Sequence, residues 1–433
     1  MALALALGTA AAVDARSPGQ EAAHWPCWRG PAHNGSSPER NLPSNWTKTQ
    51  GIAWVAPLPG ADASTPAVWG ERIFLSSTDP SGALLAIVLD RKTGRVVKQV
   101  RAGTAEKLFD PRNTSASSSP VTDGRRGYFL FGTGDLVALD LSGNLVWSRS
   151  LGKEFGSFYI KYGYGGSPLL YRGRLYIAVI QNDAHPHGGP STGPPRESFL
   201  LALDPDTGKT LWRQLRPTDA RKESKEAYTT PIPLEVAGRS EVVLMGGDCL
   251  TGHDASTGQE LWRWVGYNMN RNAMERVVVS AVAGPGLVYA AAARGRGIFA
   301  VRTGLSGRLG QEHVAWKATG SMPDVCTPAL YEGRLYVLDG DRRAVTCLDA
   351  STGEKKWEGR LEGESTLWCS PTAADGKLYC IDEEGNVFVL ACGDEFRVIS
   401  RIAMGEGPCR ASIAVAGGQL FIRTSRNLYC VGK

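Results

Sequence analysis

The sequence predicts an all-β fold on the basis of three repeating features. Short alternating apolar segments of about five residues are separated by Gly, Asp and Ser turns over most of the chain. Six of the repeated units start with a short motif of two small residues followed by proline. This start recurs as STP, SSP, GSP, TTP, CTP and CSP, at 64–66, 118–120, 166–168, 229–231, 326–328 and 369–371. An ending of the form Asp-x-x-Thr-Gly-x-x-x-Trp recurs at 204–212, 254–262 and 349–357. A period of about 40 residues with these marks predicts repeated four-stranded antiparallel units.

The clearest copy, residues 325–362, indicates how one unit is built. Strands are predicted at 329–331, 334–338 and 344–348, with a fourth around Trp357. Each pair is separated by Gly- or Asp-containing turn chemistry, which favours tight hairpins. A meander of this size cannot bury both of its faces alone, so it needs neighbouring copies on either side.

The chain ends predict that the array closes into a ring. Two further starts, VSA (279–281) and ASI (411–413), keep the spacing without the proline and bring the starts to eight. The last copy supplies only three strands, at 412–415, 419–423 and 427–431, while the segment 51–58 carries a fourth-strand Trp, Trp54, with no strands before it. An open ring would expose unpaired strand edges. We therefore predict an eight-bladed β-propeller of four-stranded antiparallel blades, its last blade closed by the N-terminal strand around Trp54.

The propeller is predicted to span residues 51–433 as a single domain, because a repeat array overrides the domain count that 433 residues would otherwise suggest. Residues 1–15 are predicted to be a signal-like segment, and the apolar run within it is too short to span a bilayer. A disordered Ala-rich start is the alternative, and whether the start is complete stays open. Residues 24–50, rich in Trp and Pro, are predicted to be a cap laid across the outside of the domain.

Bulk properties favour an exported, soluble protein, periplasmic or extracellular. The net charge of +5 is small for this length and no basic stripe is present, which argues against a nucleic-acid partner. We predict a monomer without a transmembrane span that binds a protein or peptide partner in the cell envelope.

The repeat motifs resemble a known family. The turns of the form Ala-x-Asp-x-x-Thr-Gly-x-x-x-Trp with Ser-x-Pro starts resemble the pyrroloquinoline-quinone-type (PQQ-like) repeat of quinoprotein alcohol dehydrogenases and of the outer-membrane β-barrel assembly lipoprotein. The segments 25–35 and 229–264 are similar to exported PQQ-like propellers of unassigned activity. The resemblance implies a propeller of the WD40/YVTN-like shape, in which the Trp packs between blades and Thr-Gly closes the turn. The motif itself implies no cofactor.

The chemistry implied by the dehydrogenases of that family is not matched in the sequence. Those enzymes use a vicinal cysteine pair, calcium held by Glu and Asn, and an Asp base, whereas no two of the nine cysteines here are adjacent and no such acidic set stands out. We predict no catalytic residue and no cofactor, and therefore a non-catalytic binding scaffold. A dehydrogenase using pyrroloquinoline quinone and calcium, or a sugar-handling enzyme, is the alternative.

The cysteines are predicted to be packing residues. Cys347 and Cys430 fall at the third-strand position that Ala138 and Ala202 hold in other blades, and Cys380 takes the place of Val337. Cys326 and Cys369 replace the small residue of adjacent starts, so a bridge between two blades is an alternative there. We assign no disulfide.

The candidate binding face is the one at which the innermost strands begin. The long insertions, at 103–117, 152–165, 181–198, 216–228 and 267–276, are predicted on this face. Three residues before the proline position, the eight starts carry Ala63, Ser117, Gly165, Tyr228, Val278, Val325, Trp368 and Arg410.

Tyr228, Trp368 and Arg410 are of the types enriched at binding hot spots, although they could equally serve only to close the channel mouth. Other candidates to line the same funnel are Arg112, Lys161, Tyr162 and Tyr164. Asp183, His185 and His187 form a weak metal-binding candidate in a Gly- and Pro-rich hairpin, where a solvated loop is the favoured interpretation.

Overall fold

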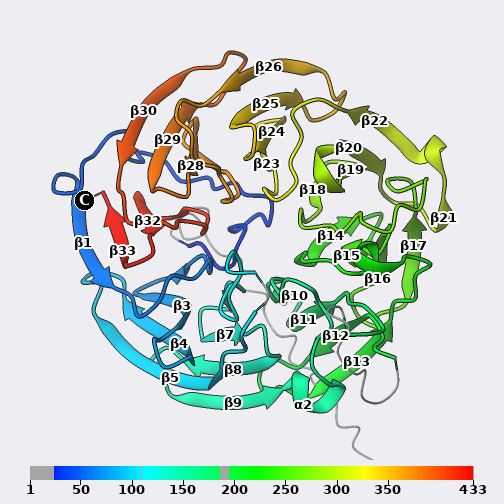
Figure 1. The fold of residues 1–433 in the computed structure, drawn as a ribbon, viewed down its shortest axis with the longest axis horizontal. Helices are drawn as coiled ribbons and strands as arrows, with labels where there is room; N and C mark the ends of the chain where they lie inside the picture. The colour runs from blue at the N-terminus through cyan, green and yellow to red at the C-terminus, as the bar shows by residue number, and fades with distance from the viewer. Residues whose placement is uncertain (1–23, 109, 186–194, 433) are drawn as a thin grey trace, which may run out of the picture.

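The computed structural model describes residues 24–108, 110–185 and 195–432. These residues form eight antiparallel sheets arranged around a central channel, with each sheet running from an innermost to an outermost strand (Figure 1). The prediction of an all-β, eight-bladed propeller is confirmed. The signal-like segment 1–15 lies outside the described residues, and no helix among the described residues is long and apolar enough to cross a membrane.

The blades follow one another in chain order. The first blade contains β2 (Ala67–Trp69), β3 (Arg72–Thr78), β4 (Ala83–Asp90) and β5 (Val96–Thr104), and the second contains β6 (Val121–Thr122), β7 (Arg126–Leu130), β8 (Asp135–Asp140) and β9 (Leu145–Ser150). The third contains β10 (Leu169–Tyr171), β11 (Arg174–Val179), β12 (Phe199–Leu203) and β13 (Thr210–Leu215), and the fourth contains β14 (Ile232–Val236), β15 (Arg239–Gly246), β16 (Cys249–Asp254) and β17 (Glu260–Trp264). The fifth blade contains β18 (Val282–Gly284), β19 (Leu287–Ala292), β20 (Gly297–Arg302) and β22 (Val314–Ala318), and the sixth contains β23 (Ala329–Tyr331), β24 (Arg334–Asp339), β25 (Ala344–Asp349) and β26 (Lys355–Arg360). The seventh contains β27 (Thr372–Ala374), β28 (Lys377–Ile381), β29 (Asn386–Ala391) and β30 (Val398–Ala403), and the eighth contains β31 (Ala414–Ala416), β32 (Gln419–Arg423), β33 (Asn427–Val431) and β1 (Ile52–Pro57).

The connections between the blade strands contain short 3-10 helices and two further elements, one strand and one α-helix. The long turn between β20 and β22 contains β21 (Gly307–Leu309), which pairs in parallel with β17 of the preceding blade. The described residues also include the short helix α2 (Leu151–Phe155), which follows β9. Both lie in turns or insertions, so the blades themselves keep the repeat of the sequence.

The fourth-strand tryptophan explains why the repeat needs a small residue on its third strand. Trp357 lies opposite Cys347, and Trp54 lies opposite Cys430, in each case where the ladder has a β-bulge or lies close to one. Cys347, Cys430 and Cys380 are completely buried, as predicted from their positions in the repeat. A small third-strand residue leaves room for the indole to lie over the sheet.

The same tryptophans join neighbouring blades. The indole of Trp316 packs on Gly353 in the next blade and donates its N–H to the carbonyl oxygen of Ala350 at 3.1 Å. Gly353 has a φ of +75°, and a Cβ there would lie 2.5 Å from the indole. The Thr-Gly turn therefore supplies both the left-handed backbone and the space that the indole occupies.

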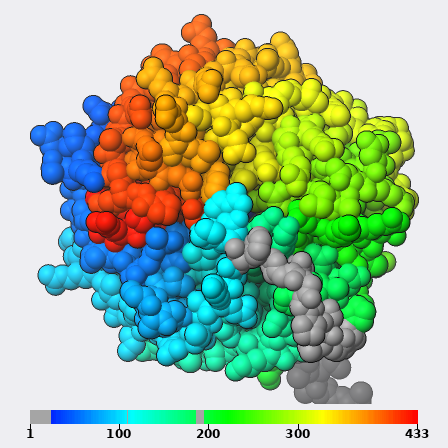
Figure 2. Space-filling model, in the orientation of Figure 1, coloured from blue at the N-terminus to red at the C-terminus, as the bar shows by residue number. Residues whose placement is uncertain are grey.

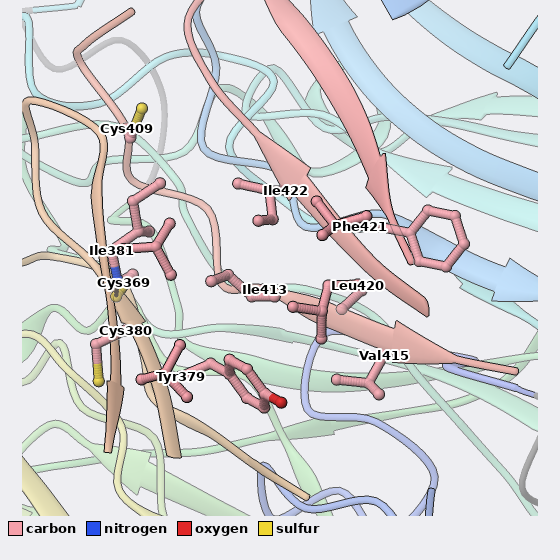
Figure 3. Packing of buried hydrophobic residues seen from close by; sticks show 14 of the residues in the cluster. Cys369, Tyr379, Cys380, Ile381, Cys409, Ile413, Val415, Leu420, Phe421 and Ile422 are labelled. Carbon is pink, nitrogen blue, oxygen red and sulfur yellow. Dashed lines mark hydrogen bonds between the residues drawn. The ribbon is translucent and has the colours of Figure 1, made fainter. Parts of the chain in front are cut away.

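The last blade closes as predicted. β1 pairs antiparallel with β33, and the Trp54 indole donates to the carbonyl oxygen of Arg91 in the first blade at 2.8 Å. Figure 3 shows buried side chains packed where the last two blades meet, among them Cys369, Ile381 and Ile422. All nine cysteines carry free thiols. The Cys326 thiol donates to the carbonyl oxygen of Leu367, so this side chain has a partner other than Cys369.

A closed ring of hydrogen bonds surrounds the channel. In every blade the residue immediately before the proline position is Ser or Thr, and its hydroxyl oxygen accepts the backbone N–H of the equivalent residue in the preceding blade at 2.9–3.2 Å. We call these residues the hydroxyl ring: Thr65, Ser119, Ser167, Thr230, Ser280, Thr327, Ser370 and Ser412. The ring satisfies the backbone donors where each innermost strand begins, and it accounts for the small polar residue of each start.

The Trp- and Pro-rich segment was predicted on the outside of the domain, and for its first half this is wrong. Residues 24–37, which we call the plug, cross the channel and bond to the free inner edges of β2, β6, β23 and β27. Figure 1 shows this dark-blue segment within the ring. The second half does run over a face of the domain, where Tyr379 donates to the carbonyl oxygen of Pro43. The innermost strands of a propeller leave unpaired edges in the channel, and the plug satisfies four of them.

Candidate functional site

One end of the channel holds a cavity of about 230 Å³. It lies at the face where the innermost strands begin, and Figure 2 views the molecule onto this face, with the blue-to-cyan atoms of the 103–117 insertion reaching toward the centre. The wall contains all eight of the residues that the sequence placed three positions before the proline position: Ala63, Ser117, Gly165, Tyr228, Val278, Val325, Trp368 and Arg410. The repeat therefore delivers one residue from every blade to the same cavity.

The wall is divided into two arcs by the order of the blades. Tyr228, Val278, Val325 and Trp368 come from four consecutive blades and make one arc aromatic and aliphatic. The other four blades contribute small residues and Arg410, and Asp110, Arg112 and Asn113 of the 103–117 insertion add polar side chains to the wall. A ligand in this cavity would meet an apolar surface on one side and a polar surface on the other.

The cavity is closed at its inner end. Trp28 of the plug borders this cavity and also a small cavity of about 10 Å³ behind it, next to Arg29 and His33. The Arg29 guanidinium is buried and donates to the carbonyl oxygens of Pro371 (3.1 Å) and Pro328 (2.8 Å), which ties the plug to two blades. The site is thus a blind pocket rather than a through-channel.

Two arginines stack over the Trp368 ring. The guanidinium carbons of Arg112 and Arg410 lie 5.4 Å and 5.2 Å from its centroid. Arg410 donates from Nε to Glu383 at 2.7 Å and from Nη1 to the carbonyl oxygens of Pro111 and Arg112. Arg112 forms an ion pair with Asp110, which keeps the pKa of the Asp110 carboxyl below its usual value. These contacts hold both guanidinium groups against Trp368, where the polar arc meets the apolar arc.

A third guanidinium and two tyrosines complete the wall. Arg276 donates to Asp324 at 3.3 Å and lies 5.7 Å from the centroid of the Tyr162 ring. The backbone N–H of Tyr162 donates to the Tyr228 hydroxyl at 3.2 Å. Burial raises the pKa of Tyr228 well above its usual value, so its hydroxyl stays protonated and able to donate.

The predicted binding residues divide into two groups. Tyr228, Trp368, Arg410, Arg112 and Tyr162 line the cavity, whereas Lys161 and Tyr164 do not. Lys161 points to Glu223 and forms an ion pair with it, and Tyr164 is buried with its hydroxyl donating to the carbonyl oxygen of Ala178. Partners on other segments hold both side chains away from the cavity. The prediction that Lys161 and Tyr164 line the funnel is therefore not supported by the cavity wall.

A buried carboxyl group ties three insertions together beside the cavity. Glu226 accepts the backbone N–H of Lys161 at 2.7 Å and the side-chain amide of Asn182 at 3.1 Å through the same oxygen. Its other oxygen is buried without a hydrogen-bond partner among the described residues. Burial raises the pKa of Glu226 from 4.5 to about 7, with the nearby Glu223 contributing in the same direction.

The metal-binding candidate does not assemble in the described residues. Asp183 bonds to Lys225 at 2.8 Å, and the His185 ring packs edge-on against Tyr159. His187 lies outside the described residues. No group of three or more His, Cys, Asp or Glu side chains able to hold a metal ion occurs within the described part of the chain.

The cavity also does not fit pyrroloquinoline quinone with calcium. Asp110, already paired with Arg112, is the one carboxylate among the described lining residues, and no cysteine lines the wall. Calcium prefers six to eight oxygen ligands that include several carboxylates. The cavity wall supplies guanidinium groups where such a site would need anionic oxygens.

Sequence reasoning missed Arg276, Trp28 and the polar side chains Asp110 and Asn113, which all line the cavity. The segments containing Arg276 and Asn113 were recognised as insertions on this face, but nothing in the insertions marks which side chain points inward. The hydroxyl ring did leave a signal, because Ser or Thr precedes the proline position in all eight starts, including the two that lack proline.

Comparisons with known proteins agree with this architecture. A family model described as "Outer membrane protein assembly factor BamB" matches residues 45–184, 191–322 and 311–394. No curated protein matches the sequence significantly.

Solved structures show the same fold at low sequence identity. BamB from Moraxella catarrhalis is 15% identical, with a TM-score of 0.58 over 87% of this chain and 98% of its own. A europium-containing methanol dehydrogenase is 11% identical, with a TM-score of 0.68 over 94% and 91%. A quinohemoprotein alcohol dehydrogenase from Comamonas testosteroni is 11% identical, with a TM-score of 0.66 over 95% and 81%. The propeller is thus shared by assembly factors and by enzymes.

Proposed function

This chain belongs to the family of the outer membrane protein assembly factor BamB, and we propose that it is a non-catalytic binding scaffold of the cell envelope. In this proposal the cavity face contacts a protein partner, and the insertions around the cavity extend the contact surface. We expect the protein to be exported and to act as a monomer, as its signal-like start and family suggest.

One observation carries the proposal: every blade directs a residue into one blind cavity whose wall combines Trp368, Tyr228 and Tyr162 with three arginines. Aromatic and arginine side chains dominate the energetics of protein–protein recognition. The same wall lacks the carboxylate set that a calcium-dependent quinone enzyme would need. A rigid ring with a single functional face suits a scaffold.

Site-specific photo-crosslinking in cells of the source organism tests this function. The photoreactive residue benzoylphenylalanine replaces either Lys107, an exposed lysine of the 103–117 insertion, or Lys92, an exposed lysine of a Thr-Gly turn on the opposite face. We expect discrete adducts of higher mass from position 107 and none from position 92. Equal adducts from both positions, or none from position 107, would contradict a binding role for this face.

The quinone alternative has its own measurement. Calorimetric titration with pyrroloquinoline quinone and Ca²⁺ should give no specific heat with the wild-type protein. Micromolar binding that is lost in an Arg410→Ala, Trp368→Ala variant would instead make the cavity a cofactor site and overturn the scaffold proposal.

A further inference from the structure

The size of the cavity limits what it can hold. Pockets for drug-sized ligands usually measure roughly 300–1,000 Å³, whereas this cavity measures about 230 Å³. It suits a small group, such as one amino-acid residue with part of its backbone, better than a large planar cofactor or a folded surface.

The closed inner end limits how a polypeptide could enter. Trp28 closes the floor, and the plug that carries it is bonded to the inner edges of four blades. A chain can therefore enter from the open face but cannot pass through. A loop tip would need two backbone segments in the mouth, whereas a chain end needs one, so the blind shape favours a chain end.

The hydrogen-bond donors on the wall favour an anionic end. Three guanidinium groups line the cavity, and each is bonded to one carboxylate: Arg112 to Asp110, Arg276 to Asp324 and Arg410 to Glu383. Nη1 of Arg112, Nε and Nη1 of Arg276 and Nη2 of Arg410 make no hydrogen bonds to the described residues. Arginine presents such donors in a planar fork that matches a carboxylate. Arg410 is held by Glu383 and two carbonyl groups, so little ordering would be needed on binding.

The apolar arc runs from Trp368, against which Arg410 and Arg112 lie, to Tyr228, whose blade is four places from that of Arg410 and therefore opposite it in the ring. This arc is suited to an apolar side chain. Val278 and Val325 sit between Tyr228 and Trp368 in the order of the blades. A residue whose carboxylate meets Arg410 and Arg112 would present its side chain to these four groups. The arginines at the Trp368 end of the arc and the apolar groups beyond them thus match the two ends of one terminal residue.

From these observations, and resting on the proposed function, we propose that the cavity binds the C-terminal residue of a partner chain, with a free carboxylate at the arginines and an apolar side chain against the arc of Tyr228, Val278, Val325 and Trp368. The partner would be recognised by its last residue, and the surrounding insertions would contact the residues before it. Recognition of terminal carboxylates by fixed donors is an established way of selecting a peptide end.

Fluorescence anisotropy with labelled pentapeptides tests the proposal on the full-length protein. The probes are Gly-Ser-Gly-Ser-Phe and Gly-Ser-Gly-Ser-Leu, labelled at the N-terminus and made both as free acids and as C-terminal amides. We expect the free acids to bind at least tenfold more tightly than the amides. Equal affinity of the two forms would overturn the proposal.

Two variants and one control locate the binding. Arg410→Met should weaken the free acids at least tenfold and leave the amides unchanged, whereas Arg95→Met, which removes an exposed arginine of a Thr-Gly turn, should change neither. Because Arg410 has structural contacts, Val278→Phe provides a second variant that fills the cavity without removing a charge, and it should abolish binding. Full affinity in Val278→Phe would place the peptides elsewhere and overturn the proposal.

Two further probes separate the sources of the carboxylate. An amidated peptide with an internal aspartate that binds as tightly as the free acids would reassign the site to acidic side chains. Phenylpropionate that displaces the peptides with equal affinity would reassign it to small carboxylic acids. If no probe binds while position 107 still forms adducts in cells, the chain-end inference fails and the scaffold function stands.

Discussion

The two ends of the channel each bury an ionisable side chain that forms no ion pair among the described residues, and they do so differently. At the closed end, the buried Arg29 guanidinium bonds to two backbone carbonyl oxygens and to no carboxylate among the described residues. Beside the open end, the buried Glu226 carboxyl accepts two N–H groups on one oxygen and leaves the other without a partner. One group fastens the plug to the blades, and the other joins three insertions of the binding face.

The difference decides which end responds to pH. Burial lowers the pKa of Arg29 to about 10, so the guanidinium keeps its charge at neutral pH. Burial raises the pKa of Glu226 to about 7, so its charge changes within the neutral range. We therefore expect the closed end to behave as a permanent clamp and the binding face to loosen as the pH rises.

The largest expected effect comes from breaking the clamp. Arg29→Met should lower the free energy of unfolding by about 4 kcal/mol, because two hydrogen bonds to a charged group are lost and two buried carbonyl groups are left without donors. Arg112→Met, at the exposed wall of the cavity, should lower it by less than about 1 kcal/mol. Urea denaturation measures both. Equal losses in the two variants would mean that the closed end is no more firmly held than the open one.

The next largest effect concerns Glu226. Because its pKa is higher in the folded protein than the ordinary value of 4.5, the folded state holds more protons between about pH 4.5 and 7, and the stability it contributes falls as the pH rises through that window. Glu226→Gln keeps an acceptor and removes the charge, so it should be more stable than the wild type at pH 8 by up to about 3 kcal/mol.

Denaturation midpoints recorded from pH 5 to pH 8.5 measure this difference. At pH 5 the two proteins should have similar stability, and the gap should open toward pH 8. Glu395→Gln, at an exposed residue, is the control. A constant gap between Glu226→Gln and the wild type at all pH values would show that Glu226 does not titrate in this range.

The blades could be predicted from the sequence, whereas the plug and the direction of some side chains at the cavity could not. The blades, their closure through Trp54 and the eight cavity positions follow from a repeat whose period can be read directly. The plug has no period, and the strand edges that bind Trp25, Pro26 and Asn34 exist only once the ring has closed. Lys161 and Tyr162 are adjacent in the chain, yet only Tyr162 lines the cavity, because Glu223 on another insertion draws Lys161 away. The direction of such side chains depends on long-range partners that no local pattern records.

The smallest expected effect concerns the hydroxyl ring, which lies between the two ends. Ser280 accepts the backbone N–H of Thr230 at 2.9 Å, although its own blade start has lost the proline. Ser280→Ala should lower the free energy of unfolding by about 1 kcal/mol, because the Thr230 N–H loses its acceptor, and Ser280→Thr should restore most of it. The hydroxyl does not ionise, so urea denaturation should give the same loss at pH 5 and at pH 8, unlike the change at Glu226. A loss that grew with pH would show that the ring and the buried carboxyl act as one unit, and the open end could then no longer be treated separately from the channel wall.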